Sequence, residues 1–455
     1  MVIAAPASGS GKTTVATGLM GALRRVGHRV APFKVGPDYI DPGYHTLATG
    51  RPGRNLDSVL VGSDLIGPLF GHGSRGTDIA VIEGVMGLFD GRVSDAKGST
   101  AEVAALLGAP VVLVVDAKGY SQSLSALLHG FVVHAAEAGI RIAGVILNRV
   151  GSERHREILT AAADRAGLCV FGALPRTEEL SVPSRHLGLV TAVEHGQAAL
   201  DAIAAMTQLV AAHVDVSAIV AAARSDVTAP VWNPADVMGT PAAGEPVVAL
   251  AAGEAFTFGY AEHRELLAAA GAVVAEFDPR SDSLPADTAA LVLPGGFPEQ
   301  FAADLSSNEP LRQQVRDMLG PIHAECAGLT YLCEDLDGAP MCGVLDGQAR
   351  FTDSLTLGYR DAVAITGSVL FAEGERLSGH EFHRTTVDYR GGVRQPAWAW
   401  SAVDGIRREG IVARNGRIHA SYLHTHPAAH PGAVARFVAQ AASFRACTPQ
   451  GGQGD

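Results

Sequence analysis

The chain of 455 residues is long enough for two or three domains at roughly 150 residues each. Hydrophobic residues make up 47% and charged residues 18%, a composition that allows large cores and excludes general disorder. The 35 Lys and Arg against 47 Asp and Glu give a formal net charge of -12. This charge argues against a protein that binds a nucleic-acid backbone, but it allows a local basic site for small anions.

Cysteine usage and hydropathy indicate the compartment. The five cysteines are scattered and none forms a CxxC pair, so we expect neither a disulfide framework nor a zinc or iron–sulfur site. The apolar residues 1–6 run at once into a Gly- and Lys-containing turn, which is unlike a secretory signal. No apolar run approaches the roughly 18 residues of a membrane span. We therefore expect a cytoplasmic protein with no membrane partner.

The first half of the chain alternates short apolar runs with Ala- and Leu-rich segments of helical spacing. The runs are apolar throughout, as is typical of parallel strands that are covered on both faces. The expected strands are residues 2–5, 78–82, 111–116 and 142–147, and the expected helices are residues 13–26, 100–107 and 121–138. This alternation predicts a doubly wound α/β sheet.

A Pro- and Gly-rich stretch divides the chain. Residues 221–245 have the composition of a linker, and a new strand pattern begins at residue 247. We therefore expect a first α/β domain at residues 1–220 and a second at residues 246–447. Residues 448–455 form a polar, Gly-rich tail.

A phosphate-binding turn follows the first expected strand and opens the first expected helix. Residues 6–14 read Pro-Ala-Ser-Gly-Ser-Gly-Lys-Thr-Thr. A Gly-rich turn at a helix start supplies the backbone N–H groups that nucleotide phosphates need. The candidate ATP-binding residues in this turn are Gly9, Gly11, Lys12, Thr13 and Thr14.

Two side chains of this turn carry specific roles. Lys12 would reach the β- and γ-phosphates, and the Thr13 hydroxyl would bind Mg²⁺. Pro6 stands where the strict pattern has its first glycine. A Gly-rich turn with a solvated lysine is the alternative interpretation.

Two acidic residues follow strands at positions where such a fold places metal ligands. Glu83 ends the expected strand 78–82, and Asp38 follows a strand that we expect to end near Phe33. A carboxylate at the carboxyl end of a central strand points into the ligand-binding crevice of an open sheet. We therefore expect Asp38 and Glu83 to join Thr13 as Mg²⁺ ligands, with Asp41 as a further candidate. Solvated loop acids are the alternative.

Asn148 ends another buried strand, at residues 142–147. An amide at that position could read the edge of the purine, so Asn148 is a candidate nucleotide-binding residue. A plain turn-forming asparagine fits the same pattern.

The second half contains a cysteine in the setting of a nucleophile. Cys326 follows a short apolar stretch and precedes Ala-Gly and a helical pattern, as in a strand–tight turn–helix elbow. Such a turn exposes the thiol, and the amino terminus of the helix favours the thiolate. A buried structural cysteine is the alternative. The remaining cysteines have no such surroundings and are interpreted as core or surface residues: Cys169, Cys333, Cys342 and Cys447.

Two further segments complete a thiol acyl-transfer site. Gly295 and Gly296 follow a strand, and their N–H groups could bind an oxyanion. The run Ser-Tyr-Leu-His-Thr-His-Pro, residues 421–427, ends a final strand with histidines that can act as the base. We favour His424 over His426 because His424 directly ends the strand-like run.

These motifs together resemble a known family. Gly-Gly-Phe-Pro-Glu, Glu-Cys-Ala-Gly and Ser-Tyr-Leu-His resemble the class I, or triad, glutamine amidotransferase domain of cobalamin biosynthesis. The phosphate turn, Phe-Lys-Val-Gly-Pro-Asp-Tyr-Ile-Asp-Pro, Asn-Leu-Asp at 55–57 and Ser-Arg-His-Leu-Gly-Leu at 184–189 resemble the amino half of the a,c-diamide synthases. Those enzymes act on cobyrinic or hydrogenobyrinic acid. The resemblance covers nearly the whole chain in the same domain order.

The resemblance implies a P-loop domain followed by a class I amidotransferase domain. ATP and Mg²⁺ would activate a corrinoid carboxylate as an acyl phosphate, which ammonia attacks. Cys326 would release that ammonia from L-glutamine, and His424 would carry the proton. Frequent Ala, Gly and Arg favour a GC-rich bacterial source and hence the cobalt-free substrate, hydrogenobyrinic acid. A homodimer is left open.

The sequence departs from the family pattern at the third triad position. The better-known class I triad has His-Pro-Glu, with the acid two residues after the base, whereas here His426 occupies that place. No carboxylate orients the imidazole by that route. His380 and His383 have a His-x-x-His spacing, but the surrounding residues indicate a strand, so contact with substrate or between domains is favoured over metal binding.

Three alternative functions fit part of the same sequence pattern. Cobyric acid synthase shares the two-domain plan, but its relatives usually carry a Cys-Gly-Gly elbow in place of Cys326-Ala-Gly. A nickel-sirohydrochlorin diamide synthase would perform the same chemistry on another tetrapyrrole. P-loop switch ATPases that act through partners resemble the first domain alone, and they have no need of a thiol elbow.

Overall fold

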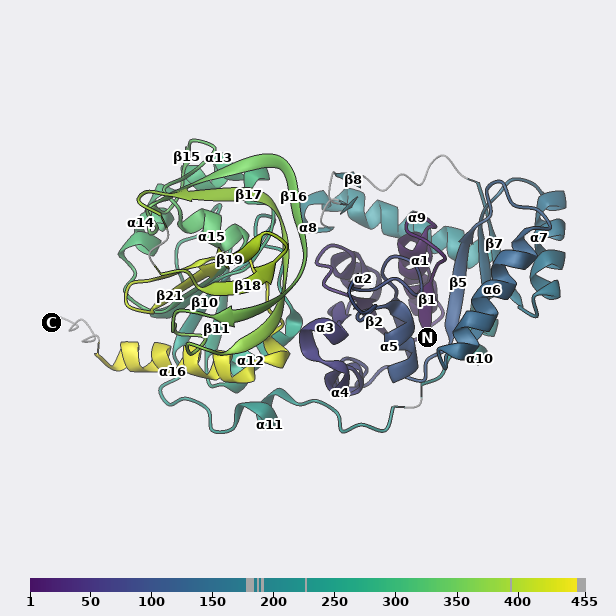
Figure 1. Ribbon diagram of the computed structural model, residues 1–455, viewed down its shortest axis with the longest axis horizontal. Helices are drawn as coiled ribbons and strands as arrows, with labels where there is room; N and C mark the ends of the chain where they lie inside the picture. The colour runs from purple at the N-terminus through teal and green to yellow at the C-terminus, as the bar shows by residue number, and fades with distance from the viewer. Residues whose placement is uncertain (177–183, 186–187, 190–191, 226, 393–394, 448–455) are drawn as a thin grey trace. The chain divides into compact units, whose positions relative to one another are not determined.

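Figure 1 shows a computed structural model of the chain, which describes residues 1–455 except 177–183, 186–187, 190–191, 226, 393–394 and 448–455. The chain divides into two compact units, Met1–Trp232 and Asn233–Asp455. Over the described residues, no helix combines the length and the apolar character that crossing a bilayer requires.

The first unit is built on a seven-stranded sheet in the order β3-β2-β4-β1-β5-β6-β7. All neighbouring pairs are parallel. The strands are β1 (Val2–Ala4), β2 (Val30–Val35), β3 (Arg54–Leu56), β4 (Ile79–Glu83), β5 (Val111–Asp116), β6 (Ile142–Val150) and β7 (Val170–Pro175). The predicted parallel α/β sheet is confirmed.

The strands alternate with helices, as parallel pairing requires. The helices are α1 (Lys12–Arg25), α2 (Asp41–Thr49), α3 (Ser58–Val61), α4 (Ser63–Gly73), α5 (Thr100–Leu106), α6 (Leu124–Glu137), α7 (Glu153–Arg165), α8 (Ala192–His195), α9 (Gln197–His213) and α10 (Val216–Ala222). A two-stranded pair, β8 (Ser184–Arg185) and β9 (Gly188–Leu189), belongs to the 184–189 motif. His186 and Leu187 of that motif lie outside the described residues.

Small residues in α1 let α9 approach that helix closely (Figure 1). A Cβ atom on Gly18 would lie 2.5 Å from the Met206 carbonyl oxygen, and one on Gly21 would lie 2.1 Å from Thr207 Oγ1. Because interiors are close-packed, a larger side chain at either position must push the two helices apart. Position 18 therefore needs glycine in spite of its poor helix propensity.

The predicted linker is partly structured. Within residues 221–245, the ring of Trp232 lies edge-on to the His72 ring of α4, with centroids 4.9 Å apart. The backbone N–H of Trp232 donates to the Pro68 carbonyl oxygen at 3.1 Å. Pro234–Met238 forms the short helix α11.

The second unit contains a six-stranded sheet in the order β11-β10-β12-β13-β21-β20. Its pairs are parallel except the β20–β21 pair at the edge. The strands are β10 (Val247–Ala251), β11 (Val273–Phe277), β12 (Thr288–Leu293), β13 (Ile322–Glu325), β20 (Ile411–Ala413) and β21 (Ile418–Ser421). The helices are α12 (Ala261–Ala269), α13 (Ala302–Ser307), α14 (Glu309–Asp317), α15 (Ala327–Leu332) and α16 (Pro431–Cys447). Two 3-10 helices are Pro298–Gln300 and Pro427–Ala429.

A second sheet in this unit was not predicted from the sequence. It has the order β15-β14-β16-β18-β19, and β17 pairs with β16. Its strands are β14 (Asp335–Leu336), β15 (Ala339–Pro340), β16 (Gly347–Ala364), β17 (Arg376–Tyr389), β18 (Trp398–Ala402) and β19 (Gly405–Glu409). An isolated antiparallel bridge joins His380 of β17 to His424, with N···O distances of 2.9 Å in both directions. This bridge holds β17 beside the segment that follows β21.

We expect Gly18→Ala to destabilise the first unit. The added methyl group meets the backbone of α9, which costs about 1–3 kcal/mol and outweighs a gain of about 1 kcal/mol in helix propensity. Gly130→Ala in α6 is the matched control, because a Cβ there meets nothing within 4 Å. It should raise the free energy of unfolding by up to ~1 kcal/mol. Urea unfolding of both variants is the measurement, and a Gly18→Ala variant as stable as Gly130→Ala would contradict the packing argument.

Candidate functional site

The phosphate turn links β1 to α1 through left-handed backbone. Gly9 has φ 77° and Gly11 has φ 96°, a region that glycine enters without strain. A Cβ on Gly11 would lie 2.3 Å from Asn148 Nδ2. The Asn148 amide donates to the Ser10 carbonyl oxygen at 2.9 Å. Asn148, predicted as a nucleotide-binding residue, therefore supports the turn from β6.

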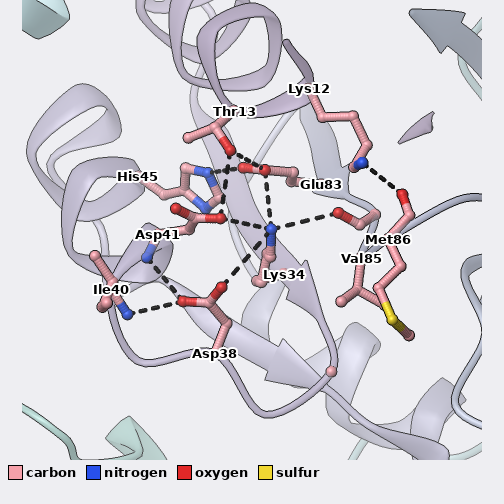
Figure 2. Close-up of polar contacts among 12 residues, drawn as sticks. Lys12, Thr13, Lys34, Asp38, Ile40, Asp41, His45, Glu83, Val85 and Met86 are labelled. Atoms are coloured by element: carbon pink, nitrogen blue, oxygen red, sulfur yellow. Dashed lines mark hydrogen bonds and ion pairs between the residues drawn. The ribbon is translucent and has the colours of Figure 1, made fainter. Parts of the chain in front are cut away.

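Lys12 begins α1 and lies against the turn rather than in bulk water. Its ammonium group donates to the carbonyl oxygens of Ala7 and Met86, and Figure 2 shows the side chain directed at Met86. Burial and the nearby Lys34 ammonium lower the pKa of Lys12. Thr13 and Thr14 follow in the first turn of the helix. The structure thus brings together the predicted nucleotide-binding residues of the turn and Asn148, a group that we call the phosphate cradle.

A buried charge cluster lies beside Thr13 (Figure 2). Lys34 of β2 contacts Asp41 Oδ2 at 2.6 Å and Glu83 Oε1 at 2.9 Å. The other Glu83 oxygen lies 2.7 Å from His45 Nε2 of α2. Thr13 Oγ1 donates to Glu83 Oε1 at 2.6 Å and lies 3.4 Å from Asp41 Oδ2. The hydroxyl and two carboxylates therefore converge at the carboxyl ends of β2 and β4.

Charge pairing decides which groups are ionised in this cluster. Burial alone would lower the pKa of Lys34, but Asp41, Glu83 and Asp38 raise it well above its ordinary value. Burial alone would raise the pKa of Glu83, but the Lys34 ammonium and hydrogen bonds from His45 and Thr13 lower it well below its ordinary value. Lys34 is therefore a cation and Glu83 an anion at neutral pH.

Asp38, which the sequence predicts as a metal ligand, bonds to the backbone at the start of α2. Its Oδ1 accepts from the backbone N–H groups of Ile40 at 2.8 Å and Asp41 at 3.0 Å, which orders the start of α2. Its Oδ2 lies 3.9 Å from Lys34 Nζ. Of the two aspartates, Asp41 is the one that lies near Thr13, with its Oδ2 3.4 Å from the Thr13 hydroxyl oxygen. Sequence reasoning assigned no role to Lys34 or His45, although a lysine inside an otherwise apolar strand was a usable signal.

Cys326 forms a sharp turn between β13 and α15. Its φ of 48° is unusual for a residue with a side chain. The Cys326 N–H donates to the Ser421 carbonyl oxygen at 2.8 Å, and a Cβ on Gly328 would lie 2.2 Å from the Leu293 carbonyl oxygen. Glycine at position 328 thus allows the helix to begin directly against β12. The prediction that this turn exposes the thiol is wrong, because the Cys326 side chain is largely buried and its sulfur lies 3.8 Å from the Phe382 carbonyl oxygen of β17.

His424 is the imidazole that meets this thiol. Burial disfavours its charged form, but hydrogen bonds with Cys326 and Glu325 outweigh burial and raise the pKa of His424 to about 10. Its Nδ1 lies 3.3 Å from Glu325 Oε2. Sequence reasoning did not identify Glu325.

His426, the alternative base, points elsewhere. Its Nδ1 accepts from the Ala428 N–H at 3.3 Å, and its ring lies against Tyr260 with centroids 4.2 Å apart. The structure therefore pairs His424, and not His426, with the cysteine.

The predicted oxyanion loop lies against the same imidazole. A Cβ on Gly295 would lie 2.5 Å from His424 Cε1, and one on Gly296 would lie 2.0 Å from the Ala255 carbonyl oxygen. Both positions require glycine for this close approach. The structure therefore brings together Cys326, His424 and the loop of Gly295 and Gly296.

The other cysteines lie in different surroundings. Cys333 and Cys342 are buried, and burial raises the pKa of both thiols, that of Cys342 to about 12. Cys169 is exposed. The side chain of Cys447 lies outside the described residues. A buried thiol with a raised pKa is a poor nucleophile at neutral pH. Cys326 differs from these cysteines because it contacts the imidazole of His424.

The His-x-x-His segment lies within β17, as its surroundings predicted. His383 Nδ1 lies 2.8 Å from the Thr385 carbonyl oxygen, and its ring stacks on Tyr422 with centroids 3.8 Å apart. His380 lies edge-on to the ring of Tyr359 at 5.2 Å. The two histidines thus have separate neighbours and do not form a pair.

Comparison with known proteins identifies both halves. Residues 1–190 match the family model of the CobQ/CobB/MinD/ParA nucleotide binding domain. Residues 247–431 match the CobB/CobQ-like glutamine amidotransferase domain. The first half therefore contains a nucleotide-binding domain, and the second contains a glutamine amidotransferase domain.

Relatives that match this chain over nearly their full length are named a,c-diamide synthases. The hydrogenobyrinate a,c-diamide synthase of Mycobacterium tuberculosis is 62% identical over 97% of this chain and 98% of its own length. That of Streptomyces coelicolor is 54% identical over 96% of both chains. The cobyrinate a,c-diamide synthase of a Synechococcus strain is 37% identical over 96% of this chain and 97% of its own. With its nucleotide-binding turn, its thiol elbow and this full-length similarity, the chain belongs to the family of a,c-diamide synthases.

Proposed function

We propose that the chain is an ATP- and glutamine-dependent C–N ligase that amidates the a and c acetate carboxylates of hydrogenobyrinic acid in cobalamin biosynthesis. One observation carries the proposal. The chain has a phosphate cradle at Lys12 in one unit and a thiol–imidazole pair, Cys326 and His424, in the other. A P-loop switch ATPase would need only the first. The names of the relatives do not favour cobyric acid synthase or a nickel-sirohydrochlorin enzyme.

The first unit would activate the carboxylate. The turn at Gly9 and Gly11 offers backbone N–H groups to the phosphates of ATP, and Lys12 would follow the γ-phosphoryl group as it moves to the carboxylate oxygen. The products are ADP and an acyl phosphate. Ammonia then attacks the acyl carbon, phosphate leaves, and an amide remains.

The second unit would supply the ammonia. His424 holds the proton that the Cys326 thiol gives up, and the sulfur attacks the carboxamide carbon of glutamine. His424 returns that proton to the departing nitrogen, so ammonia leaves and a thioester remains. Water then hydrolyses the thioester to glutamate. Backbone donors near Gly295 and Gly296 would stabilise the oxyanion.

The residues beside the cradle fit Mg²⁺. Hydroxyl and carboxylate oxygens are its preferred ligands, and it usually keeps contacts with water and phosphate. Thr13 and Glu83 supply such oxygens, together with Asp41 or Asp38. Among the described residues no three acidic, His or Cys side chains are arranged to hold a metal alone. Mg²⁺ would therefore need the nucleotide phosphates, where it supplies charge neutralisation.

The identity of the ring follows from the degree of similarity. The relatives at 62% and 54% identity are named for hydrogenobyrinate, and the one at 37% is named for cobyrinate. This gradient supports the cobalt-free ring. Cytoplasmic location and a homodimer stay predictions, and the mass of the protein in solution tests the latter.

The two sites should separate by mutation. We expect Cys326→Ala to lower glutamine-dependent amidation by at least ~10³-fold, because the nucleophile is lost, while amidation with free ammonia continues. Lys12→Ala should abolish both reactions. The measurements are amide formation with each nitrogen donor and ammonia release from glutamine.

Cys169→Ala is the control for a cysteine change, since Cys169 is exposed and should leave both reactions intact. If the wild type releases no ammonia from glutamine, with or without ATP and corrinoid, the proposed function fails. If Cys326→Ala is equally inactive with free ammonia, the division of labour between the two sites is wrong.

Removal of divalent cations should affect the two reactions differently. We expect chelation to stop amidation with either nitrogen donor, because the phosphates lose their counter-charge. Glutamine hydrolysis by the thiol needs no metal ion in this scheme and should continue. Equal loss of both reactions, reversed by Mg²⁺, would contradict the assignment of the metal to the first unit.

Substrate preference tests the ring assignment. We expect the purified protein to turn over hydrogenobyrinic acid with a higher kcat/KM than cobyrinic acid, measured by formation of the a,c-diamide from each. A preference for the cobalt-containing ring would overturn the choice of substrate but would leave the ligase assignment intact.

A further inference from the structure

A largely buried carboxylate, that of Glu325, lies beside the proposed base. Glu325 is the last residue of β13 and immediately precedes Cys326, and its Oε2 lies 3.3 Å from His424 Nδ1. The position two residues after His424, where the class I triad has its acid, is occupied by His426. We propose that Glu325 is the positioning acid of the thiol site, which orients His424 and balances its positive charge. This inference rests on the glutamine hydrolysis proposed above.

The backbone explains how adjacent residues reach one imidazole. β13 and β21 are parallel neighbours, and Glu325 is in register with Ser421, three residues before His424. The left-handed turn at Cys326 then redirects the chain, so the side chains of Glu325 and Cys326 both reach the ring. A carboxylate at Nδ1 fixes a proton on that nitrogen, so Nε2 is the atom that exchanges a proton with the Cys326 sulfur.

The carboxylate is itself held in place. Its second oxygen, Oε1, lies 3.3 Å from His323 Nε2 and accepts from the Thr425 hydroxyl at 3.3 Å and the Thr425 N–H at 3.4 Å. Burial would raise the pKa of Glu325, but the hydrogen bonds with His323 and His424 lower it well below its ordinary value. Glu325 is therefore an anion over the whole working pH range.

The other titratable groups around the site leave this pairing undisturbed. Burial lowers the pKa of His263 in α12 to about 4, and that of His380 in β17 and His419 in β21 to about 3. These three rings are therefore neutral at pH 7. Arg360, which acts on His380, is paired with Glu381 at 2.6 Å. Glu325 and the Cys326 thiol are the partners that raise the pKa of His424.

The test is Glu325→Gln, which keeps the size of the side chain and removes its charge. We expect kcat for glutamine hydrolysis to fall by about 10²- to 10⁴-fold, the range seen when a triad acid is made neutral. KM should stay within about twofold, because Glu325 acts through His424 and not on glutamine. The pH at which the His424 ring titrates, followed by ¹⁵N NMR, should move down by about one unit or more as the anionic partner is lost.

Conservative and remote variants separate positioning from a structural role. Glu325→Asp keeps the charge and should recover part of the rate and of the His424 titration midpoint. Glu375→Gln is the matched control, because Glu375 pairs with Arg436 on the surface of the same unit at 2.8 Å. It should leave both readouts unchanged.

Several outcomes would overturn the inference. If Glu325→Gln hydrolyses glutamine at the wild-type rate, Glu325 has no positioning role and the proposed function stands. The same holds if the rate falls but the His424 titration does not move in either variant. If His426→Gln removes activity and Glu325→Gln does not, His426 is the partner. Should Glu325→Gln fail to fold, the Glu325→Asp readouts decide. A wild type without glutaminase activity removes the proposed function together with this inference.

Discussion

Both proposed sites depend on a backbone turn through the left-handed region between a parallel strand and the helix that follows it. In the first unit the turn uses Gly9 and Gly11, which adopt φ values of 77° and 96° without cost. In the second unit the residue at the turn must carry a thiol, and Cys326 adopts φ 48°. Such a conformation costs about 1–3 kcal/mol, so the surrounding structure has to hold it.

The neighbours of Cys326 provide that support. Its N–H bonds to β21 through Ser421, and Gly328 lets α15 start with no side chain between its backbone and Leu293 of β12. The turn is thus fixed from two strands of the central sheet. Holding the sulfur in this way directs it at the imidazole, which is the geometry that general-base activation of a thiol needs.

Local sequence patterns predicted both of these turns. Lys12 and Cys326 were identifiable because each follows an apolar strand run and opens a helical one, so sequence neighbours alone define their surroundings. The choice between Asp38 and Asp41 was not decidable in that way, because it depends on which carboxylate reaches Lys34 and Thr13 after the chain folds. Lys34, buried in β2, is tolerable only because acids from α2 and β4 meet it.

The sequence did not predict Glu325 as the partner of His424 for a related reason. The family pattern directs attention to the residue two positions after the base, whereas the carboxylate comes from β13, about a hundred residues earlier in the chain. In the usual arrangement acid and base share one segment. Here acid and nucleophile share one, so the relation of Glu325, Cys326 and His424 is set by the register of β13 on β21. Position 426 therefore does not need an acid, and the ring of His426 packs on Tyr260. The site can work with a histidine at position 426 because, in this proposal, the negative charge beside His424 comes from Glu325 of β13.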